Sequence, residues 1–326
     1  MKLSVALCTY NGAAFLSKQL ESIAAQTRLP DELIVCDDCS TDDTRRIVEA
    51  FIARAPFPVR LQINEQNLGS TKNFEQAIQL CAGEIIALSD QDDVWRADKL
   101  RRIAEVFASA PGVGLVISDA ELVDEELRTF DRRLWQETMT ARERRLMVEG
   151  QAFVVLLNRN VVTGATMAFR SRYKDLFLPL PDDLFLIHDG WIALVIASVS
   201  SIALLDEPLV KYRQHSGQQL VLRGKDAPPP PDTPARRREY YSGEGEKLRR
   251  VRERLEAFGG ATSDEEKRLL RTRIKQMREK EQHYAVRGDL PESRLARVSV
   301  VWRELRTHRY RRHSKGFLSA AKDLLR

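Results

Sequence analysis

Several features that would assign the chain to a particular class of protein are absent from its 326 residues or scarce in them. No stretch approaches the roughly 18 consecutive apolar residues of a membrane span, and the opening MKLSVALCTYNG has a strand's length and no small-residue cleavage site. The four cysteines are too few for a disulfide scaffold in a chain this long. We therefore expect a globular, cytoplasmic protein in a reducing compartment.

The common nucleotide-binding motifs are also missing. No G-x-G-x-x-G follows the first apolar run, and no G-x-x-x-x-G-K-[ST] provides a phosphate loop. The stretch CDDC gives Cys36 and Cys39 a spacing found in redox and zinc sites, but Cys8 and Cys81 do not form the second pair that zinc would need. We interpret Cys36 as a small apolar residue of a strand.

Positive charge is scarce in one part of the chain and concentrated in another. Residues 225–326 contain 27 Lys and Arg against 16 Asp and Glu, whereas residues 1–224 contain 25 against 31. A basic appendage suggests an anionic partner, either a membrane surface or a nucleic acid, and the alternative is a set of solvated helices. No helix-turn-helix, zinc-finger or RNA-module motif is present, so we expect no nucleic-acid partner.

The first 120 residues alternate between strand-like and helix-like patterns. Short β-rich runs occupy residues 2–8, 32–37, 59–64 and 84–89, and helix-length segments with one apolar stripe lie between them. This order predicts an α/β fold with a mostly parallel, Rossmann-like sheet flanked by helices. Ligands of such sheets bind at the carboxyl ends of the strands.

Polar residues follow each of the four predicted strands, in the stretches CTYNG, DDCSTDD, NEQNLGSTKN and SDQDDVW. Any one of them suits a helix cap or a turn. Capping needs one oxygen per helix, however, and does not explain paired acids at two separate strand ends. Adjacent carboxylates repel each other unless a cation intervenes. The pattern therefore predicts Mn²⁺ or Mg²⁺ held by carboxylates and by the phosphates of a substrate.

These motifs together resemble the family 2 glycosyltransferases, which have the GT-A fold. The matching stretches are TYNG, VCDDCSTDDT, NLGSTKNF and LSDQDDVW, followed in the expected order by VTGATMAFR, HDGWIALV and LDEPLVKYRQH. The later stretches are similar to the bacterial rhamnosyltransferase-like branch that builds cell-surface polysaccharides. The resemblance covers residues 2 to about 222. It implies a catalytic domain over residues 1–224, with a nucleotide-binding half at 1–120 and an acceptor-binding half at 121–224.

The resemblance also implies roles for individual residues. Thr9 and Tyr10 would sit beside the nucleotide base, and Asp38 would accept a hydrogen bond from it. In DQDD, Asp92 and Asp93 match the metal and ribose carboxylates of the family. The residues implied to bind the nucleotide sugar are Thr9, Tyr10, Asn11, Asp38, Lys72, Asn73, Asp92 and Arg213. Those implied to bind the metal are Asp90, Asp92 and Asp93, and the imidazole of His215 would complete the coordination or touch the diphosphate.

The catalytic base implied by the resemblance is Asp189 in HDGW. Family 2 enzymes invert the anomeric centre, so one carboxylate takes the proton of the acceptor hydroxyl as its oxygen attacks. Spacing alone also allows Asp189 to cap the helix-like segment that follows it. On the acceptor side, the candidate residues are Thr163, Gly164 and Trp191.

The last hundred residues have a different character. The proline-dense stretch KDAPPPPDTPARRR marks a linker over residues 225–238, and residues 239–326 are predicted to form basic helices. Because Lys- and Arg-rich amphipathic helices bind anionic headgroups, we hypothesise peripheral contact with the cytoplasmic face of a membrane. Packing against the catalytic domain and formation of a homodimer are alternatives.

The sequence thus predicts a metal-dependent inverting glycosyltransferase. It would move rhamnose or another sugar from a dTDP- or UDP-linked donor to a glycan or lipid-linked acceptor in cell-surface polysaccharide synthesis. A nucleotidyltransferase is one alternative, but it would need a Gly-rich, basic signature that CTYNGAAFLSK lacks. A non-catalytic scaffold with the same fold is the other. The presence of Asp92, Asp93 and Asp189 argues against a scaffold, and only an activity measurement excludes it.

Overall fold

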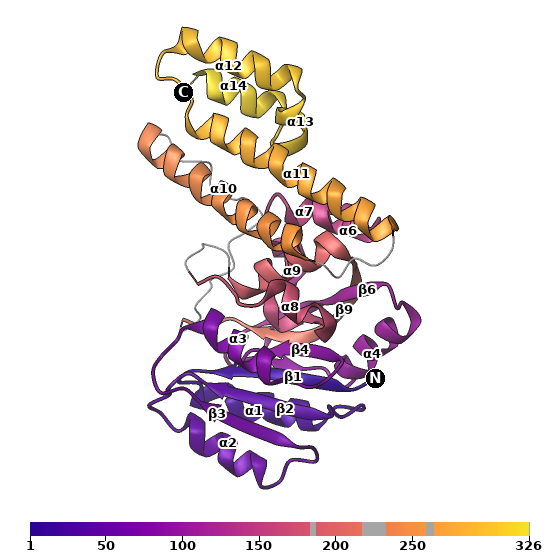
Figure 1. Ribbon diagram of the computed structural model, residues 1–326. Helices are drawn as coiled ribbons and strands as arrows, with labels where there is room; N and C mark the ends of the chain where they lie inside the picture. Colours follow the sequence, from indigo (N-terminus) through magenta and orange to yellow (C-terminus); the bar gives the residue numbers. More distant parts are fainter. Residues whose placement is uncertain (183–186, 217–232, 259–263, 326) are drawn as a thin grey trace. The chain divides into compact units, whose positions relative to one another are not determined.

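The computed structural model describes residues 1–182, 187–216, 233–258 and 264–325. They divide into two compact units, which are described separately. The first unit contains the described residues up to 216 except 157–160, and the second contains 157–160 and all that follow 232 (Figure 1). The domain boundary predicted after residue 224 lies outside the described residues, and so does most of the predicted linker.

Four parallel strands form the first half of the sheet in the first unit. Strand β1 (Leu3–Thr9) lies between β2 (Glu32–Asp37) and β4 (Ile85–Ser89), and β3 (Val59–Ile63) pairs with the far side of β2. These strands lie where the sequence predicts them. Every residue of β1 is buried, as expected for a parallel strand covered on both faces.

The second half of the sheet is mixed. Strand β8 (Met167–Arg170) runs antiparallel between β4 and β6 (Val113–Val123), and β9 (Ser201–Arg213) runs parallel to β6. Two short strands pair antiparallel with β9 and β6, respectively: β5 (Val94–Trp95) and β7 (Thr129–Arg133). The long β9 brings its last residues to the same end of the sheet as the ends of β1 and β4.

Helices flank this sheet (Figure 1). Their bounds are α1 Ala13–Ala24, α2 Thr44–Ile52, α3 Ser70–Leu80, α4 Lys99–Ser109, α5 Leu134–Thr138, α6 Ala141–Val148, α7 Ala152–Leu156, α8 Lys174–Phe177 and α9 His188–Val199. The apolar stripe of α1, with Leu16, Leu20 and Ile23, packs in the core against the sheet, as its spacing predicts. Helix α9 is apolar on all sides and buried along its length, so its first residues are held rigidly. The predicted α/β fold is confirmed.

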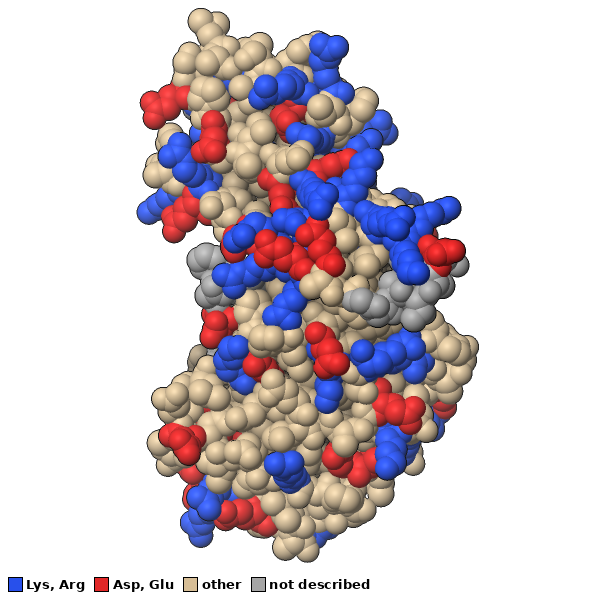
Figure 2. Space-filling view, viewed as in Figure 1, with Lys and Arg blue, Asp and Glu red and all other residues tan. Residues whose placement is uncertain are grey.

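The second unit consists of helices, as predicted for the basic C-terminal extension. They are α10 Pro234–Ala257, α11 Asp264–Gly288, α12 Arg294–Arg306, α13 Arg309–His313 and α14 Phe317–Leu325. Helix α10 therefore begins inside the segment predicted as a linker, with Pro in its first turn and Thr233 as its N-cap. Figure 2 shows Lys and Arg side chains interleaved with Asp and Glu over much of the visible face. No described helix is both long enough and apolar enough to cross a bilayer.

Candidate functional site

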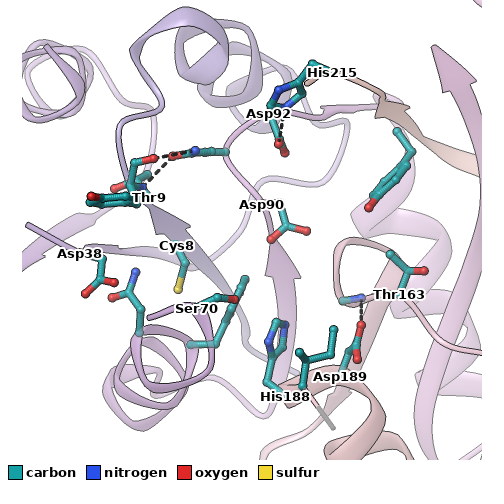
Figure 3. A pocket seen from close by; sticks show the side chains of 17 residues that line it. Cys8, Thr9, Asp38, Ser70, Asp90, Asp92, Thr163, His188, Asp189 and His215 are labelled. Carbon is teal, nitrogen blue, oxygen red and sulfur yellow. Dashed lines mark hydrogen bonds and ion pairs between the residues drawn. The ribbon is translucent and has the colours of Figure 1, made fainter. Parts of the chain in front are cut away.

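The polar stretches that follow the predicted strands meet around one pocket of the first unit (Figure 3). It lies at the carboxyl ends of β1, β2 and β4, and it is closed by the start of α3, the start of α9 and the end of β9. The lining includes most of the predicted site residues, namely Thr9, Tyr10, Asp38, Asn73, Asp90, Asp92, Thr163, Gly164, Asp189 and His215. The convergence follows from the topology, because parallel strands end at the same edge.

Asp38 fixes the loop that precedes α3. Its carboxylate accepts hydrogen bonds from the backbone N–H groups of Leu68 at 2.8 Å and Gly69 at 2.9 Å. The Nδ2 of Asn64 donates to the same carboxylate at 2.8 Å. Asn73, on the first turns of α3, accepts a second hydrogen bond from Asn64 at 3.0 Å. Asp38 is buried and lines the pocket from this tethered loop, so its position is rigid.

Gln91 is a lining residue that the sequence analysis missed. Its Oε1 accepts from the Tyr10 N–H at 2.8 Å, and its Nε2 donates to the Tyr10 carbonyl at 3.0 Å. The side chain therefore clamps the ends of β1 and β4 together. A Cβ at Gly12 would lie 2.1 Å from Gln91 Oε1, so a larger residue there would displace the Gln91 side chain. No local pattern in the sequence announces such a long-range clamp.

Two acids at the end of β4 face the pocket. Asp92 Oδ2 lies 2.9 Å from His215 Nε2, which joins the loop after β4 to the end of β9. Asp90 is half-buried beside it. Burial raises the pKa of Asp90 to about 7, and the nearby carboxylates of Asp92 and Asp189 contribute to the rise. The pocket thus gathers negative charge that the protein itself does not neutralise well.

Lys99, a buried cation near these acids, is another residue that the sequence analysis did not identify. Its Nζ donates to the Ala165 carbonyl at 2.7 Å and lies 3.8 Å from the centre of the Trp95 ring. Burial lowers the pKa of Lys99 to about 7, although the charges of Asp93 and Asp90 oppose that shift. Lys99 is therefore a weak counter-charge at neutral pH.

Asp93 lies behind the pocket and is not among the residues that line it. It is completely buried, and its Oδ1 accepts from the backbone N–H of Arg213 at 3.1 Å. Burial raises its pKa well above the ordinary range, with the charges of Asp92 and Asp90 adding to the effect. The structure thus separates two neighbours of the predicted metal set, since Asp92 faces the pocket and Asp93 does not.

Arg213 and Lys72 also have partners outside the pocket. The Nε of Arg213 donates to the carbonyl of Asp92 at 2.6 Å, and another of its guanidinium nitrogens donates to the carbonyl of Glu125. Lys72 Nζ donates to Glu75 at 3.0 Å and to the carbonyl of Leu180 at 2.8 Å. Neither side chain lines the pocket. These contacts favour structural roles over the predicted binding of the donor.

Asn11 and Trp191 are two further predicted residues that do not line the pocket. Asn11 has a positive φ of 46°, and its Oδ1 accepts from the Thr41 N–H at 2.9 Å, so it joins the loops after β1 and β2. Trp191 is buried, and its indole N–H donates to the carbonyl of Phe177 at 2.8 Å. This places Trp191 in the core rather than on an acceptor surface.

Asp189 is held at the start of α9 by backbone donors. Its Oδ2 accepts from the N–H of Gly164 at 3.2 Å, and its Oδ1 accepts from the N–H of Gly190. The N-cap position of α9 is Ile187, and Asp189 lies in the first turn. The carboxylate is buried, and it lines the pocket beside Thr163 and Gly164 (Figure 3). It faces the same cavity as Asp90 and Asp92.

His188, next to Asp189, is a buried lining residue with an unusual environment. Its ring stacks on Phe74 with the centroids 4.1 Å apart. Neither ring nitrogen has a hydrogen-bond partner among the described residues. Burial lowers the pKa of His188 to about 3, so the imidazole is neutral at physiological pH.

Known proteins resemble the chain over this same region. A model of glycosyl transferase family 2 matches residues 4–177. The uncharacterized glycosyltransferase alr2836 of Nostoc sp. is 31% identical over 219 residues, which are 66% of this chain and 65% of alr2836. The dTDP-rhamnosyl transferase RfbG of Shigella flexneri is 34% identical over 110 residues, which are 32% of this chain and 38% of RfbG. The matches thus span less than two thirds of either relative.

A solved structure extends the likeness to the fold. TarS residues 1–349 of S. aureus, crystallised with UDP-GlcNAc, superposes with a TM-score of 0.57 at 18% identity and covers 99% of this chain and 91% of that one. This supports the predicted GT-A fold. Since the family model covers more than half of the sequence, including the ends of β1, β2 and β4, the chain belongs to glycosyl transferase family 2.

Proposed function

We propose that the chain is a metal-dependent, inverting glycosyltransferase that takes its sugar from a nucleoside diphosphate in the cytoplasm. The observation that carries this proposal is that a buried carboxylate on α9, Asp189, shares one pocket with the acids that follow β4, Asp90 and Asp92, and with His215. A base and a site for a charged leaving group are the two requirements of the reaction. The family match and the fold support the same class of chemistry.

Asp189 is the catalytic base of this proposal. It takes the proton of an acceptor hydroxyl while that oxygen attacks the anomeric carbon of the donor. The new glycosidic bond forms as the bond to the diphosphate breaks, and the nucleoside diphosphate leaves with the electron pair. The N–H groups of Gly164 and Gly190 hold the carboxylate in one orientation, so the base is positioned before the substrates bind.

Asp92 and His215 would hold a divalent cation. Within the described residues, no three His, Cys, Asp or Glu side chains form a ready metal cluster, so a cation there would also need ligands from the donor phosphates. The donor set fits, because a carboxylate oxygen and a neutral imidazole both suit Mn²⁺. The crowding that raises the pKa of Asp90 would also be relieved by a cation. Such an ion stabilises the charge that develops on the leaving diphosphate.

Thr9, Tyr10 and Asp38 form the candidate base site, and Thr163 and Gly164 the candidate acceptor side. RfbG is a dTDP-rhamnosyl transferase, and TarS was crystallised with UDP-GlcNAc. We therefore propose a dTDP- or UDP-linked donor. The acceptor we propose is a glycan or a lipid-linked glycan of cell-surface polysaccharide synthesis, as also suggested by the similarity to the putative teichuronic acid biosynthesis glycosyltransferase TuaG of Bacillus subtilis.

Calorimetric titration with the dTDP, UDP and GDP forms of the nucleotide and its sugar, in Mn²⁺ and in EDTA, tests this proposal. We expect one base to bind, with an affinity at least about tenfold weaker in EDTA. Asp92→Asn should abolish the difference between Mn²⁺ and EDTA. Asp93→Asn is the matched control, because Asp93 is an adjacent acid behind the pocket, and it should keep the difference. Binding of no nucleotide would instead favour a non-catalytic scaffold.

A further inference from the structure

The last helices of the second unit expose large apolar side chains. On α12, Leu295, Val298 and Trp302 are spaced to share one face and are 86%, 54% and 63% exposed, respectively. On α14, Phe317 is 83% exposed and is followed by two exposed leucines, Leu318 and Leu325. We call these six side chains and the exposed basic residues of α12–α14 the C-terminal face.

These exposed side chains are not needed by the core of the unit. Helices α12 and α14 lie next to each other (Figure 1), and their inner sides contribute Val301 and Ala320 to one cluster with Leu290 and Tyr310. The core of α12–α14 is therefore already filled by other side chains of the same helices. Exposed Trp, Phe and Leu side chains on a basic surface are characteristic of an interaction site.

The charge of the C-terminal face has one sign. Residues 294–325 contain only two acids, Glu304 and Asp323, and both are buried. The exposed basic residues Arg294, Arg303, Arg306, Arg311, Lys315 and Lys322 form no ion pair with any described residue. On α10, by contrast, Arg249 and Arg250 both pair with Glu246. Acidic neighbours thus offset part of the positive charge of α10, but not that of these six residues of α12–α14.

We infer that the C-terminal face docks on the headgroup region of an anionic lipid bilayer. Its basic residues complement anionic phosphates, and its apolar side chains can enter the boundary between headgroups and acyl chains, where Trp is favoured. A nucleic acid would use the same charge but would leave Leu295 and Leu318 without a suitable partner, since aliphatic side chains do not stack on bases as aromatic ones do. The inference stands whether or not the chain transfers a sugar.

Trp302 gives a direct test with the full-length protein. Of the four tryptophans, the other three are at least 96% buried, so a shift of fluorescence upon docking reports on Trp302. With vesicles of phosphatidylcholine and about one third phosphatidylglycerol, we expect a blue shift, quenching by brominated acyl chains, and co-sedimentation that weakens with salt. Vesicles of pure phosphatidylcholine should give little blue shift, quenching or co-sedimentation. Unchanged emission, or equal binding to both vesicles, would overturn the inference.

Variants separate the apolar from the electrostatic contribution. Leu295→Ser combined with Phe317→Ser should weaken vesicle binding at least about tenfold, because these side chains enter the bilayer. Val148→Ser is the matched control, since Val148 is 70% exposed on α6 of the first unit, and it should change nothing. If the double variant instead binds normally while Arg303→Glu with Arg306→Glu does not, the face binds polyanions without insertion. If the double variant binds vesicles normally but sediments as a monomer where the wild type sediments as a dimer, the C-terminal face is an interface between two copies of the chain. Either result would refute bilayer docking.

A second inference concerns His188 and rests on the proposed function. The imidazole is buried, stacked on Phe74 and lines the pocket that holds Asp189, and neither of its nitrogens has a hydrogen-bond partner among the residues that the structure describes. Its Nε2 lies so close to Gly164 that a Cβ there would be 2.9 Å away, so the ring occupies the space that a side chain would otherwise fill. A buried polar group without a partner is costly unless a ligand provides one.

The geometry points to a sugar hydroxyl as the missing partner of His188. A neutral imidazole offers one donor and one acceptor, and a hydroxyl can satisfy either. Phe74 fixes the ring plane, and the adjacent base Asp189 lies in the same pocket, so the hydroxyl would belong to a sugar at the reacting end of the site. The hydroxyl belongs to the donor sugar or to the acceptor sugar. Calorimetric affinity for the donor and KM for the acceptor distinguish the two.

His188→Phe keeps the stacking on Phe74 and removes both nitrogens. We expect it to fold normally and to lower kcat/KM about tenfold or more, with the loss appearing in the affinity for one of the two sugars. His188→Gln, which restores a donor and an acceptor, should recover part of that loss, whereas a purely structural role would make Gln the worse substitute. A wild-type protein without transferase activity would refute the proposed function. An active wild type matched by His188→Phe would refute this inference alone.

Discussion

Two acids, Asp323 in the second unit and Asp90 in the first, have opposite surroundings. In the second unit, Asp323 accepts two hydrogen bonds from Arg287, at 2.7 and 3.0 Å, and a third from the Tyr310 hydroxyl at 2.8 Å. In the first unit, Asp90 lines the pocket next to Asp92, and Lys99, a buried cation near it, gives its hydrogen bond to a carbonyl. Asp323 is matched by a cation of its own unit, whereas Asp90 has Asp92 and Asp189 as acidic neighbours.

The pKa values of Glu304 in the second unit and Asp90 in the first unit show the same contrast. Burial alone would raise the pKa of Glu304 in the second unit, but hydrogen bonds from His283 and Arg309 hold it below its ordinary value. Burial raises the pKa of Asp90, and its acidic neighbours raise it further. Internally matched acids stabilise the fold. Acids left without a counter-charge lower stability, and we interpret that loss as the cost of a site prepared for a cation and a diphosphate.

The largest effect should come from Asp189→Asn. Asn keeps an oxygen that can accept from Gly164 but cannot take a proton, so kcat should fall about 10²- to 10⁴-fold while donor affinity stays within a factor of about three. Initial rates of sugar transfer and calorimetry measure the two quantities. Asp206→Asn is the control, because Asp206 is an exposed acid that pairs with Arg144. A loss of less than tenfold for Asp189→Asn would assign the base elsewhere.

Asp323→Asn tests the buried ion pair of the second unit. Removing one partner of a buried ion pair leaves Arg287 without its counter-charge and should cost about 3–5 kcal/mol of stability in the second unit. Hydrogen exchange of α11 and α14 amides measures this cost. Asp289→Asn is the control, because Asp289 pairs with Arg238 at the surface and should change stability by less than about 1 kcal/mol. Equal effects of the two variants would remove the distinction between buried and exposed pairs.

The fold and the location of the pocket could be predicted because both depend on local patterns. Alternating strand and helix periods specify the order of β1 to β4, and the parallel topology then brings their carboxyl ends to one edge. Thr9, Asp38 and Asp92 follow those strands, so their convergence needs no knowledge of side-chain contacts. Asp189 was identified by resemblance, since its spacing also suits a helix cap.

The direction of individual side chains could not be predicted. Asp90, Gln91 and Asp92 all line the pocket, whereas Asp93 is buried behind it and accepts a hydrogen bond from the backbone N–H of Arg213. A motif identifies the segment but not which of two neighbours reaches the ligand. Gln91 and Lys99 act through contacts with residues far away in the chain, which leave no local signal. The positions of Arg213 and Trp191 depend on such contacts as well.

Of these variants, Asp90→Asn should have the smallest effect. It should raise the free energy of unfolding, whereas Asp323→Asn should lower it. With a pKa of about 7 in the folded chain against an ordinary value near 3.8, Asp90 keeps its proton longer in the folded than in the unfolded state. The wild type therefore loses stability as the pH rises from about 4 to 7, and the Asn variant does not. In EDTA at pH 8 we expect the variant to be more stable by about 1–2 kcal/mol, a figure reduced for the partial exposure of Asp90.

Urea denaturation at pH 8 and pH 4 measures this difference, which should vanish at pH 4, where Asp90 is protonated in both states. Asp98→Asn is the matched control in the same unit. Asp98 is paired with Arg96, and its hydrogen bonds from that guanidinium hold its pKa below the ordinary value, so its loss should lower stability at pH 8 by up to about 1 kcal/mol. If Asp90→Asn were destabilising too, the acids of the pocket would be matched internally after all, and the case for an external cation would rest on the family alone.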